Sequence, residues 1–567
     1  MDVTLDDRLG ALQQISQRKL VDILDSIVGK KDLVIEQKLF KILESFIGAT
    51  VLKQHGVDKI FKFEAGLKPS NTQRIFLVSG DLIACKRVLD QIQSELMQAH
   101  GLAFHVLVAP HVPAVVRSLV EEEGLAELVT LYSLSWEFIQ LDGNVLSLEY
   151  PMFANLYYHK DTGLLPAMAR CLWSMQLVLG APRLTLSFGK HSENILKMIE
   201  SMRESSRITR YDKEIGCLVL MDRNYDLVST FLTPVSYVGL VSEVLPLSVG
   251  TATLDSSKIK LDPKKDRVYG DVRDIHFSDV FPKLRAMAKS LKSEQESTQT
   301  MELADMTHYV STRLHEMVEV KAQLASHISA CEAIVGALGS DFEALQFTEK
   351  SILDCARRKE CLDYIEKNID DHPMRSLRLL CLLSQTSDGV TQSEWQPIQK
   401  SHLHAHGYRH IPLIHKLETS GLLRRRRSML RNKLPNWNSE WTTNAQRLKL
   451  LPGQSKRTDS KTSGTACPSY VFSSNYIPAI AQFLNIILNQ TTDPRSFEDL
   501  INLPGCLTIG SRGHVQPKTV VMCIIGGITF AEISACRLIE RSTGIRLVLI
   551  SDTILTGNKL IESIQDS

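Results

Sequence analysis

The sequence has few cysteines, no long hydrophobic run and almost no net charge, and each absence excludes a class of protein. Eleven cysteines in 567 residues are sparse and odd in number, which favours reduced thiols over a disulfide framework. The most apolar run, Val520 to Ile528, is about half of the roughly 20 residues that a membrane-spanning helix requires. With 65 Lys and Arg against 64 Asp and Glu, the net charge of +1 gives no global attraction to nucleic acid or to an anionic membrane.

The N-terminus also lacks the features of a secretion signal. Met1 to Asp7 is acidic where a signal peptide has a basic start and an apolar stretch. Hydrophobic residues at 44% and charged residues at 23% are typical of a soluble globular protein, and this length predicts three or four compact units. We therefore expect a soluble, cytoplasmic protein of several domains.

Short apolar segments alternate with helical ones in the N-terminal quarter of the chain. This alternation predicts a parallel sheet covered by helices, and hence an α/β domain at residues 1–136. The predicted strands are residues 32–36, 59–64, 74–79, 104–109 and 128–134, with helices at 37–53 and 82–100.

A second α/β series begins near residue 183, stops near residue 240 and resumes only at residue 519. Its predicted elements are strands at 183–188, 217–222, 519–526 and 547–551 and a helix at 193–203. Two C-terminal strands and two helices alone cannot bury a sheet on both faces. The C-terminal segment should therefore complete the earlier sheet, which predicts a discontinuous second domain, residues 137–240 plus 469–567, around a mainly helical insertion, residues 241–468.

The insertion contains a pattern typical of two antiparallel helices. Apolar residues recur at helical spacing through 275–291 and again through 302–338, one stripe in each, and the polar residues 293–300 suit a hairpin tip. The pattern is compatible with a helix pair packed within its own domain and with a projecting arm. The segment 453–466 has no apolar period and predicts a disordered loop.

No motif with catalytic mechanics is present. Residues 505–511 have the glycine spacing of a phosphate loop, but Ser511 stands where the lysine must be. Gly526-Gly527 lacks the third glycine of a dinucleotide fingerprint, so it indicates a tight strand-to-helix turn. Of the clustered histidines 402, 404, 406, 410 and 415, His402, His406 and His410 could share a helical face at i, i+4 spacing. No cysteine lies nearby and Gly407 weakens the helix, so a polar face is favoured over zinc. We expect neither cofactor nor metal.

Asp222, Arg223 and Asp226 follow a predicted buried strand, a place where α/β proteins often carry active-site carboxylates. No partner acid, nucleophile or glycine-rich loop accompanies them, so a structural charge network is favoured. An α/β hydrolase or nucleotide-binding enzyme that uses this cluster is the competing hypothesis. The arginine run at 424–427 could bind phosphate, lipid or an acidic partner, although a solvated turn is favoured.

Four sequence blocks resemble the SM (Sec/Munc-type) family of SNARE regulators. They are Leu218–Val228 (LVLMDRNYDLV) continuing through Ser236–Val241 (SYVGLV), Tyr470–Pro478 (YVFSSNYIP), Gly526–Arg537 (GGITFAEISACR) and Leu547–Ser551 (LVLIS). Their order around a helical insertion is also the family's architecture, and the resemblance covers nearly the whole chain. Within the family the chain is similar to the class C vacuolar protein sorting branch, type thirty-three, B form. The segments that resemble this form are Gly29–Leu33, Leu52–Lys59, His327–Glu332 and Ser376–Ser384.

The resemblance implies an arch-shaped fold, with two parallel-sheet α/β domains and a helical insertion that carries a projecting hairpin at about 275–338. It implies a non-enzymatic regulator of vesicle fusion that binds SNARE helices at the hairpin and the adjoining cleft. It also implies binding to a helical-solenoid class C subunit of the sixteen type, B form, and indirect, peripheral residence on late endosomes, lysosomes or recycling endosomes. A tethering scaffold that does not bind SNAREs is the alternative.

Two sets of residues are therefore candidates. Basic groups beside apolar stripes suit an acidic amphipathic helix, which places partner binding at Lys289, Lys292, Met306, Tyr309, Arg313 and Lys321. The family signature, for which a structural role is favoured, supplies Asp222, Arg223, Asp226, Tyr237, Gly526, Gly527, Glu532 and Arg537.

Overall fold

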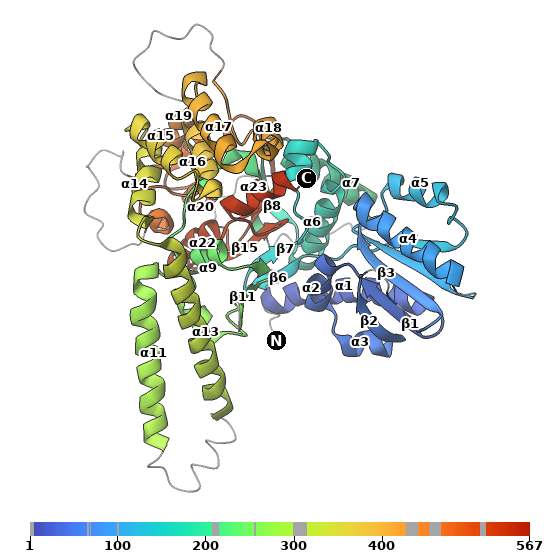
Figure 1. Ribbon diagram of the computed structural model, residues 1–567. Coiled ribbons are helices and arrows are strands. Elements are labelled where there is room, and N and C mark those ends of the chain that lie inside the picture. The colour runs from blue at the N-terminus through green and yellow to red at the C-terminus, as the bar shows by residue number, and fades with distance from the viewer. Residues whose placement is uncertain are drawn as a thin grey trace. The chain divides into compact units, whose positions relative to one another are not determined.

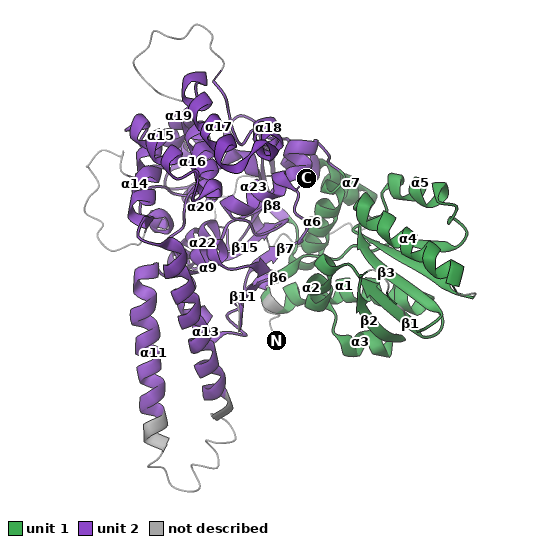
Figure 2. Cartoon of the chain, in the orientation of Figure 1, with its two compact units in different colours: residues 1–140, 163–181, 197–212 green, residues 141–162, 182–196, 213–567 purple. Residues whose placement is uncertain are grey.

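The chain forms two compact units (Figure 2). The first comprises residues 1–140, 163–181 and 197–212, and the second comprises residues 141–162, 182–196 and 213–567. The computed structural model describes residues 5–64, 67, 70–98, 101–206, 215–254, 257–298, 314–426, 440–452, 467–510 and 517–566. Each unit contains a wholly or mainly parallel sheet, which confirms the predicted fold class.

The first unit is built on a five-stranded parallel sheet in the order β2-β1-β3-β4-β5. Its strands are β1 (Lys31–Ile35), β2 (Val57–Lys62), β3 (Gln73–Ser79), β4 (Ala103–Ala109) and β5 (Val129–Ser133). Its helices are α1 (Leu5–Ser26), α2 (Gln37–Phe46), α3 (Ala49–Gln54), α4 (Leu82–Gln98), α5 (Ala114–Glu122) and α6 (Leu165–Leu179). The predicted single helix at 37–53 is wrong, because Ile47 is extended and divides it into α2 and α3.

Alternate residues of the central strands pack against α4 and α5 to form the core of this unit. Phe76 and Val106, from neighbouring strands, lie in one buried cluster with Leu89 of α4 and Val116 of α5. These runs are apolar because a parallel sheet is covered on both faces.

The second unit contains a seven-stranded sheet in the order β13-β8-β9-β14-β15-β7-β6. Its strands are β6 (Ile139–Asp142), β7 (Val145–Ser147), β8 (Pro182–Phe188), β9 (Ile215–Asp222), β13 (Cys506–Gly510), β14 (Thr519–Ile525) and β15 (Arg546–Ser551). The C-terminal strand β14 pairs in parallel with both β9 and β15, so segments about 300 residues apart share one sheet. Strand β13 is antiparallel to β8 and occupies most of the segment 505–511, whose glycine spacing resembles that of a phosphate loop. The domain boundaries drawn after residues 136, 240 and 468 stay predictions.

Helices make up most of the rest of the second unit (Figure 1). Helix α7 (Lys190–Ser205) begins in the second unit and continues into the first at residue 197. The other helices close to the sheet strands in sequence are α8 (Val228–Phe231), α9 (Tyr237–Val244), α20 (Ala479–Leu488), α21 (Pro494–Ile501), α22 (Phe530–Thr543) and α23 (Gly557–Gln565). The helices between α9 and α20 in the chain are α10 (Arg267–Val272), α11 (Phe277–Thr298), α13 (Leu314–Leu338), α14 (Phe342–Leu353), α15 (Arg358–Lys367), α16 (Pro373–Thr386), α17 (Gln392–His406), α18 (Ile411–Thr419) and α19 (Glu440–Arg447). The short helices are η1 (Asn155–His159), η2 (Arg223–Tyr225), η3 (Tyr408–His410) and η5 (Pro468–Phe472), and a small antiparallel sheet contains β10 (Leu247–Ser248), β11 (Thr251–Thr253) and β12 (Lys258–Lys260).

Helices α11 and α13 lie side by side (Figure 1), with Val280 and Leu284 of α11 and Leu324 of α13 buried. The predicted hairpin tip at 293–300 is wrong in its position, because α11 stays helical through residue 298. Residues 299–313 and the predicted loop at 453–466 lie outside the described residues. Among the helices that are described, none is both long and apolar enough to span a membrane.

Candidate functional site

The first group of predicted site residues lies at the end of β9, around a buried ion pair. Arg223 donates from Nη1 and Nη2 to the two carboxylate oxygens of Glu532, at 2.9 and 2.8 Å, and both side chains are 0% exposed. Arg223 also donates to the carbonyl oxygens of Gly527 and Asp226. The carboxylate partner of Arg223 is therefore not one of the neighbouring aspartates but a residue 309 positions away on α22.

Asp222 and Asp226 have their carboxylate oxygens occupied by hydrogen bonds. Asp222 accepts from the backbone N–H groups of His191 and Ser192 and from the Ser192 hydroxyl, at 2.6–2.9 Å, and so caps the start of α7. Burial raises the pKa of Asp222, although these bonds oppose the rise.

Asp226 accepts from four donors of two segments far apart in sequence. They are the Ser229 N–H and hydroxyl, the Tyr476 hydroxyl and the Ala479 N–H, at 2.6–3.1 Å. The bond to Ala479 satisfies the first turn of α20, in the way that a carboxylate caps a helix. Both aspartates therefore connect elements of the fold and offer no open carboxylate to a substrate.

Gly526 and Gly527 form the turn from β14 toward α22. Both have left-handed backbone, at φ 103° and 97°, and a Cβ on Gly527 would lie 1.9 Å from Leu555 Cδ2. Their N–H groups donate to Oδ1 of Asp552, at 2.7 and 2.8 Å. An anion-binding turn is thus already filled by a carboxylate of the chain itself. Sequence reasoning missed Asp552, although its place directly after a buried strand is the same signal that marked Asp222.

The remaining signature residues reach the insertion. Tyr237, at the start of α9, contacts Nδ1 of His327 through its hydroxyl at 2.7 Å, and the other ring nitrogen of His327 lies 3.2 Å from Asp266. All three side chains are buried. This polar contact joins α9 to α13.

Arg537 of α22 pairs with Asp142 at 2.8 Å and with Asp274 at 3.4 Å. Burial opposes its charge, but the two carboxylates raise the pKa of Arg537 above its ordinary value. The structure therefore brings all eight signature residues into buried contacts, and it joins Arg223 directly to Glu532 and to the backbone of Asp226 and Gly527.

The second group of predicted residues lies on the helix pair. Lys289 and Lys292 are exposed on α11, and Lys321 is exposed on α13. Met306, Tyr309 and Arg313 lie outside the described residues. Three of the four predicted basic residues are therefore exposed on the helix pair, and the positions of Arg313, Met306 and Tyr309 stay predictions.

The prediction of one apolar stripe for the second helix is wrong. Helix α13 buries Leu324, His327 and Cys331 on one side, and it leaves apolar side chains exposed on another. The exposed fractions are 61% for Val318, 37% for Ile328 and 53% for Val335. Lys321, Ile328 and Val335 recur every seven residues, so they follow one line along the helix. We call Val318, Lys321, Ile328 and Val335 the outer face of α13.

Three of the five histidines noted in the sequence lie together in the structure. The rings of His402, His406 and His410 lie within 5.4 Å of each other, centroid to centroid, and His402 Nε2 is 3.1 Å from His410 Nδ1. Burial, followed by the charges of the two neighbours, lowers the pKa of His402 to about 4. His404 and His415 are exposed and stand apart. In the part of the chain that the structure describes, no group of three His, Cys, Asp or Glu side chains is arranged to hold a metal ion.

Comparison with known proteins decides the family. The model of the Sec1 family matches residues 31–563. The chain belongs to the Sec1 family. The resemblance stated from the sequence is therefore confirmed.

Curated relatives of this Sec1-family chain are vacuolar sorting proteins of type thirty-three. It is 26% identical to vacuolar protein sorting-associated protein 33B of Rattus norvegicus over 605 residues, which covers 98% of this chain and 97% of the relative. It is also 26% identical over 601 residues to the vacuolar protein-sorting-associated protein 33 homolog of Arabidopsis thaliana, with coverage of 98% and 97%. Its fold is similar to that of the SM protein Vps45 in complex with the Qa SNARE Tlg2, at a TM-score of 0.60 and 15% identity, over 98% of this chain and 97% of that one.

Proposed function

We propose that this Sec1-family chain is a non-enzymatic regulator of SNARE-mediated vesicle fusion, and that it binds a SNARE helix on α11 and the outer face of α13. The observation that carries the proposal is the outer face itself. A surface helix of a globular protein keeps its apolar side chains on the side that faces the core. Helix α13 instead exposes Ile328 and Val335 in line with Lys321, and also exposes Val318, which lies three residues before Lys321. A seven-residue apolar repeat is the surface that a partner helix packs against.

The physical role of this surface is to hold a disordered segment in helical form. Ordering a backbone costs about 1–2 kcal/mol per residue, and anchors that are already in place offset part of this cost. Lys289, Lys292 and Lys321 would set register and encounter rate with an acidic helix, while the apolar residues hold the complex. The Vps45 structure with its Qa SNARE supports this kind of partner.

A non-catalytic role is supported by the state of the carboxylates at the end of β9. A general acid or base must have a free oxygen within reach of a substrate, and the oxygens of Asp222 and Asp226 are occupied by bonds that hold the fold together. Glu532 is likewise committed to Arg223.

We further propose that the chain binds a helical-solenoid class C subunit of the sixteen type, B form. Through it the chain would reside peripherally on late endosomal, lysosomal or recycling-endosome membranes. Two exposed apolar side chains at the junction of η3 and α18 support a second interface: Tyr408 is 74% exposed and Ile411 is 45% exposed. Helix α18 packs on α23, so this surface is continuous with the second α/β domain.

The test of SNARE binding uses the outer face, because its residues contribute little to folding. Val318→Asp with Val335→Asp should weaken binding of an assembled SNARE-motif bundle at least tenfold in a titration, with an unchanged far-UV spectrum. The matched control is Val28→Asp, since Val28 is 83% exposed and lies in the first unit. Equal affinity of the double variant and the control would remove the outer face from the mechanism.

The alternative of a scaffold that does not bind SNAREs is tested in the same assay with both partners. Tyr408→Asp with Ile411→Asp should abolish capture of the solenoid subunit and leave SNARE affinity unchanged, while the α13 variant should do the reverse. Capture of the solenoid by the wild-type chain without detectable SNARE binding would favour the scaffold.

A further inference from the structure

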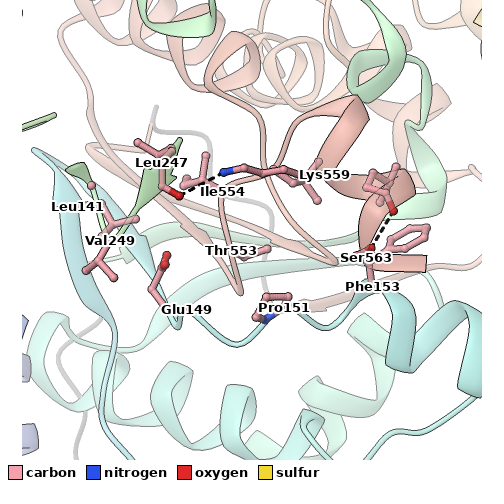
Figure 3. Close-up of a pocket in the computed structure, with 13 residues that line it drawn as sticks. Leu141, Glu149, Pro151, Phe153, Leu247, Val249, Thr553, Ile554, Lys559 and Ser563 are labelled. Carbon is pink, nitrogen blue, oxygen red and sulfur yellow. Dashed lines mark hydrogen bonds between the residues drawn. The ribbon is translucent and has the colours of Figure 1, made fainter. Parts of the chain in front are cut away.

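A cavity lies beyond the carboxyl ends of two neighbouring parallel strands of the second unit, β7 and β15 (Figure 3). Its volume is about 240 Å³. Ligands of open α/β sheets bind outside the carboxyl ends of the strands, and the volume is close to the lower end of the range for small-molecule pockets. The cavity is separate from the charge network at the end of β9 and from α13.

The lining of the cavity is mostly apolar but contains two opposite charges. Leu141, Phe153, Leu247, Ile554 and Leu560 supply apolar walls. Figure 3 shows Glu149 and Lys559 on opposite sides of the space, and both are half-buried.

Glu149 and Lys559 attract each other electrostatically across the cavity but do not form a direct ion pair. Lys559 Nζ makes one long hydrogen bond, 3.4 Å, to the carbonyl oxygen of Leu247, and Glu149 Oε1 accepts from the Ser147 hydroxyl at 2.6 Å. Burial raises the pKa of Glu149 and lowers that of Lys559, although the charge of each group opposes the shift of the other. Charged groups in apolar surroundings require an opposite charge.

The backbone of the lining is strained at two positions. Glu149 and Val249 both have left-handed backbone, at φ 55° and 46°. This conformation is unfavourable for any residue with a side chain, and most of all for a β-branched one. Strain of this kind occurs mainly where a side chain must be held for a ligand, and here it fixes the side chain of Glu149 toward the cavity.

We propose that this cavity binds a free neutral amino acid with a branched or aromatic side chain. The ammonium group of the ligand would pair with Glu149, its carboxylate with Lys559, and its side chain would fill the apolar part. A zwitterion is the small ligand that neutralises both separated charges at once. A peptide terminus carries only one of the two groups and would leave the other charge unpaired.

The experiment is calorimetric titration of the full chain with L-leucine and L-phenylalanine, and with two leucine analogues that each lack one charge, 4-methylpentanoate and 3-methylbutylamine. We expect saturable binding of at least one of the two amino acids and at least tenfold weaker binding of both analogues. Glu149→Gln and Lys559→Met should each weaken amino-acid binding at least tenfold. The matched control is Asp566→Asn, an exposed acid at the C-terminal end of the helix that carries Lys559, which should change affinity less than twofold.

Three results would overturn the proposal. One is the absence of saturable binding up to about 10 mM of either amino acid, a limit that detects even weak complexes. Another is equal affinity for leucine and one of its singly charged analogues. The third is unchanged affinity in a folded Glu149→Gln or Lys559→Met variant. None of these results bears on SNARE binding, which is measured on a different surface.

Discussion

Neutralising Glu532 is the sharpest test of the buried charge network, and Glu532→Gln is the variant that isolates the charge. The carboxylate accepts two hydrogen bonds from Arg223 in a site with no solvent exposure. Glutamine has nearly the same shape, so the substitution creates no cavity. It removes the negative charge and turns an NH2 group toward one guanidinium nitrogen, where neither group can accept a hydrogen bond.

The expected loss follows from the burial of the pair. Removing one partner of a buried ion pair costs about 3–5 kcal/mol, because the other charge stays buried without compensation. The amide oxygen of the variant can take the place of Oε2, where it keeps the hydrogen bonds from Arg223 Nη1 and from the Thr529 N–H, both at 2.9 Å. We therefore expect the lower end, about 3 kcal/mol.

Hydrogen exchange followed by mass spectrometry measures this loss locally. A chain of two compact units has no single unfolding free energy, whereas exchange reports the opening of each segment. A loss of about 3 kcal/mol corresponds to about 100-fold faster exchange at tenfold per 1.4 kcal/mol. It should appear in peptides of α22 and of the end of β9, and peptides of α4 in the first unit should be unchanged.

An exposed ion pair supplies the control. Arg357 and Glu360 are 3.4 Å apart with side chains 57% and 65% exposed, so Glu360→Gln should change local stability by less than about 0.5 kcal/mol. Arg223→Met combined with Glu532→Leu should be less destabilising than either single change. If Glu532→Gln accelerates exchange less than threefold, or if the single effects add in the double variant, the ion pair is not what holds β9 to α22.

Four further predictions concern the turn, the sheet, the helix pair and the histidines. Gly527→Ala should lower the stability of the second unit by about 2–5 kcal/mol in urea unfolding, because of the backbone strain and the contact with Leu555. The control Gly544→Ala, with open space around the new methyl group, should cost only about 1–2 kcal/mol. Micromolar nucleotide affinity that the Gly527 change destroys would contradict a purely geometric role. Deleting residues 520–567 removes β15 and nearly all of β14 and exposes β9, so the truncated chain should aggregate on expression. A soluble product that still binds the solenoid would refute a discontinuous second domain. SNARE binding should be weakened, most strongly at low salt, by the combined changes Lys289→Glu, Lys292→Glu and Arg313→Glu. The control variant, with Lys258→Glu, Lys260→Glu and Lys264→Glu, should bind as the wild type does. Equal affinity of the two triple variants at low ionic strength would remove the basic positions from the mechanism. The pKa of His402 falls from 6.5 to about 4 on folding, so unfolding takes up a proton between these values. The stability of α17 should therefore be full above about pH 6.5 and fall toward pH 4, by up to about 1.4 kcal/mol per pH unit, in exchange data corrected for the pH dependence of intrinsic exchange. A His402→Gln variant with the same pH dependence would refute this assignment.

The sheets could be predicted from the sequence because parallel strands are buried on both faces. β9, β14 and β15 are continuous apolar runs, and they were placed within a residue or two of their observed bounds. The edge strand β13 was missed because its side chains are mostly exposed or half-buried, and β7 because it has only three residues. Helix α1 was missed although 22 residues form it. Short or exposed strands carry too little apolar pattern to be distinguished from loops.

The contacts within the candidate site could not be predicted in the same way. The ion pair of Arg223, the bonds of Asp226 to Tyr476 and Ala479, and the facing positions of Glu149 and Lys559 all join residues hundreds of positions apart. Helical periodicity did place Leu324 and Cys331 of α13 on a buried side. It could not show that His327 would share that side, because a buried imidazole depends on hydrogen-bond partners that local pattern does not reveal.

The contact of Tyr237 with His327 gives the signature residues a mechanical meaning. The end of β9 is held to α22 by Arg223 and Glu532, and the chain then passes through α8 into α9, where Tyr237 contacts α13. A surface on α13 can keep a partner helix in register only if the base of α13 does not shift. A buried polar network resists such shifts because the displaced groups would lose hydrogen bonds. Residues that resemble an active site at a strand end can thus serve binding, by fixing the base of the helix that carries the outer face.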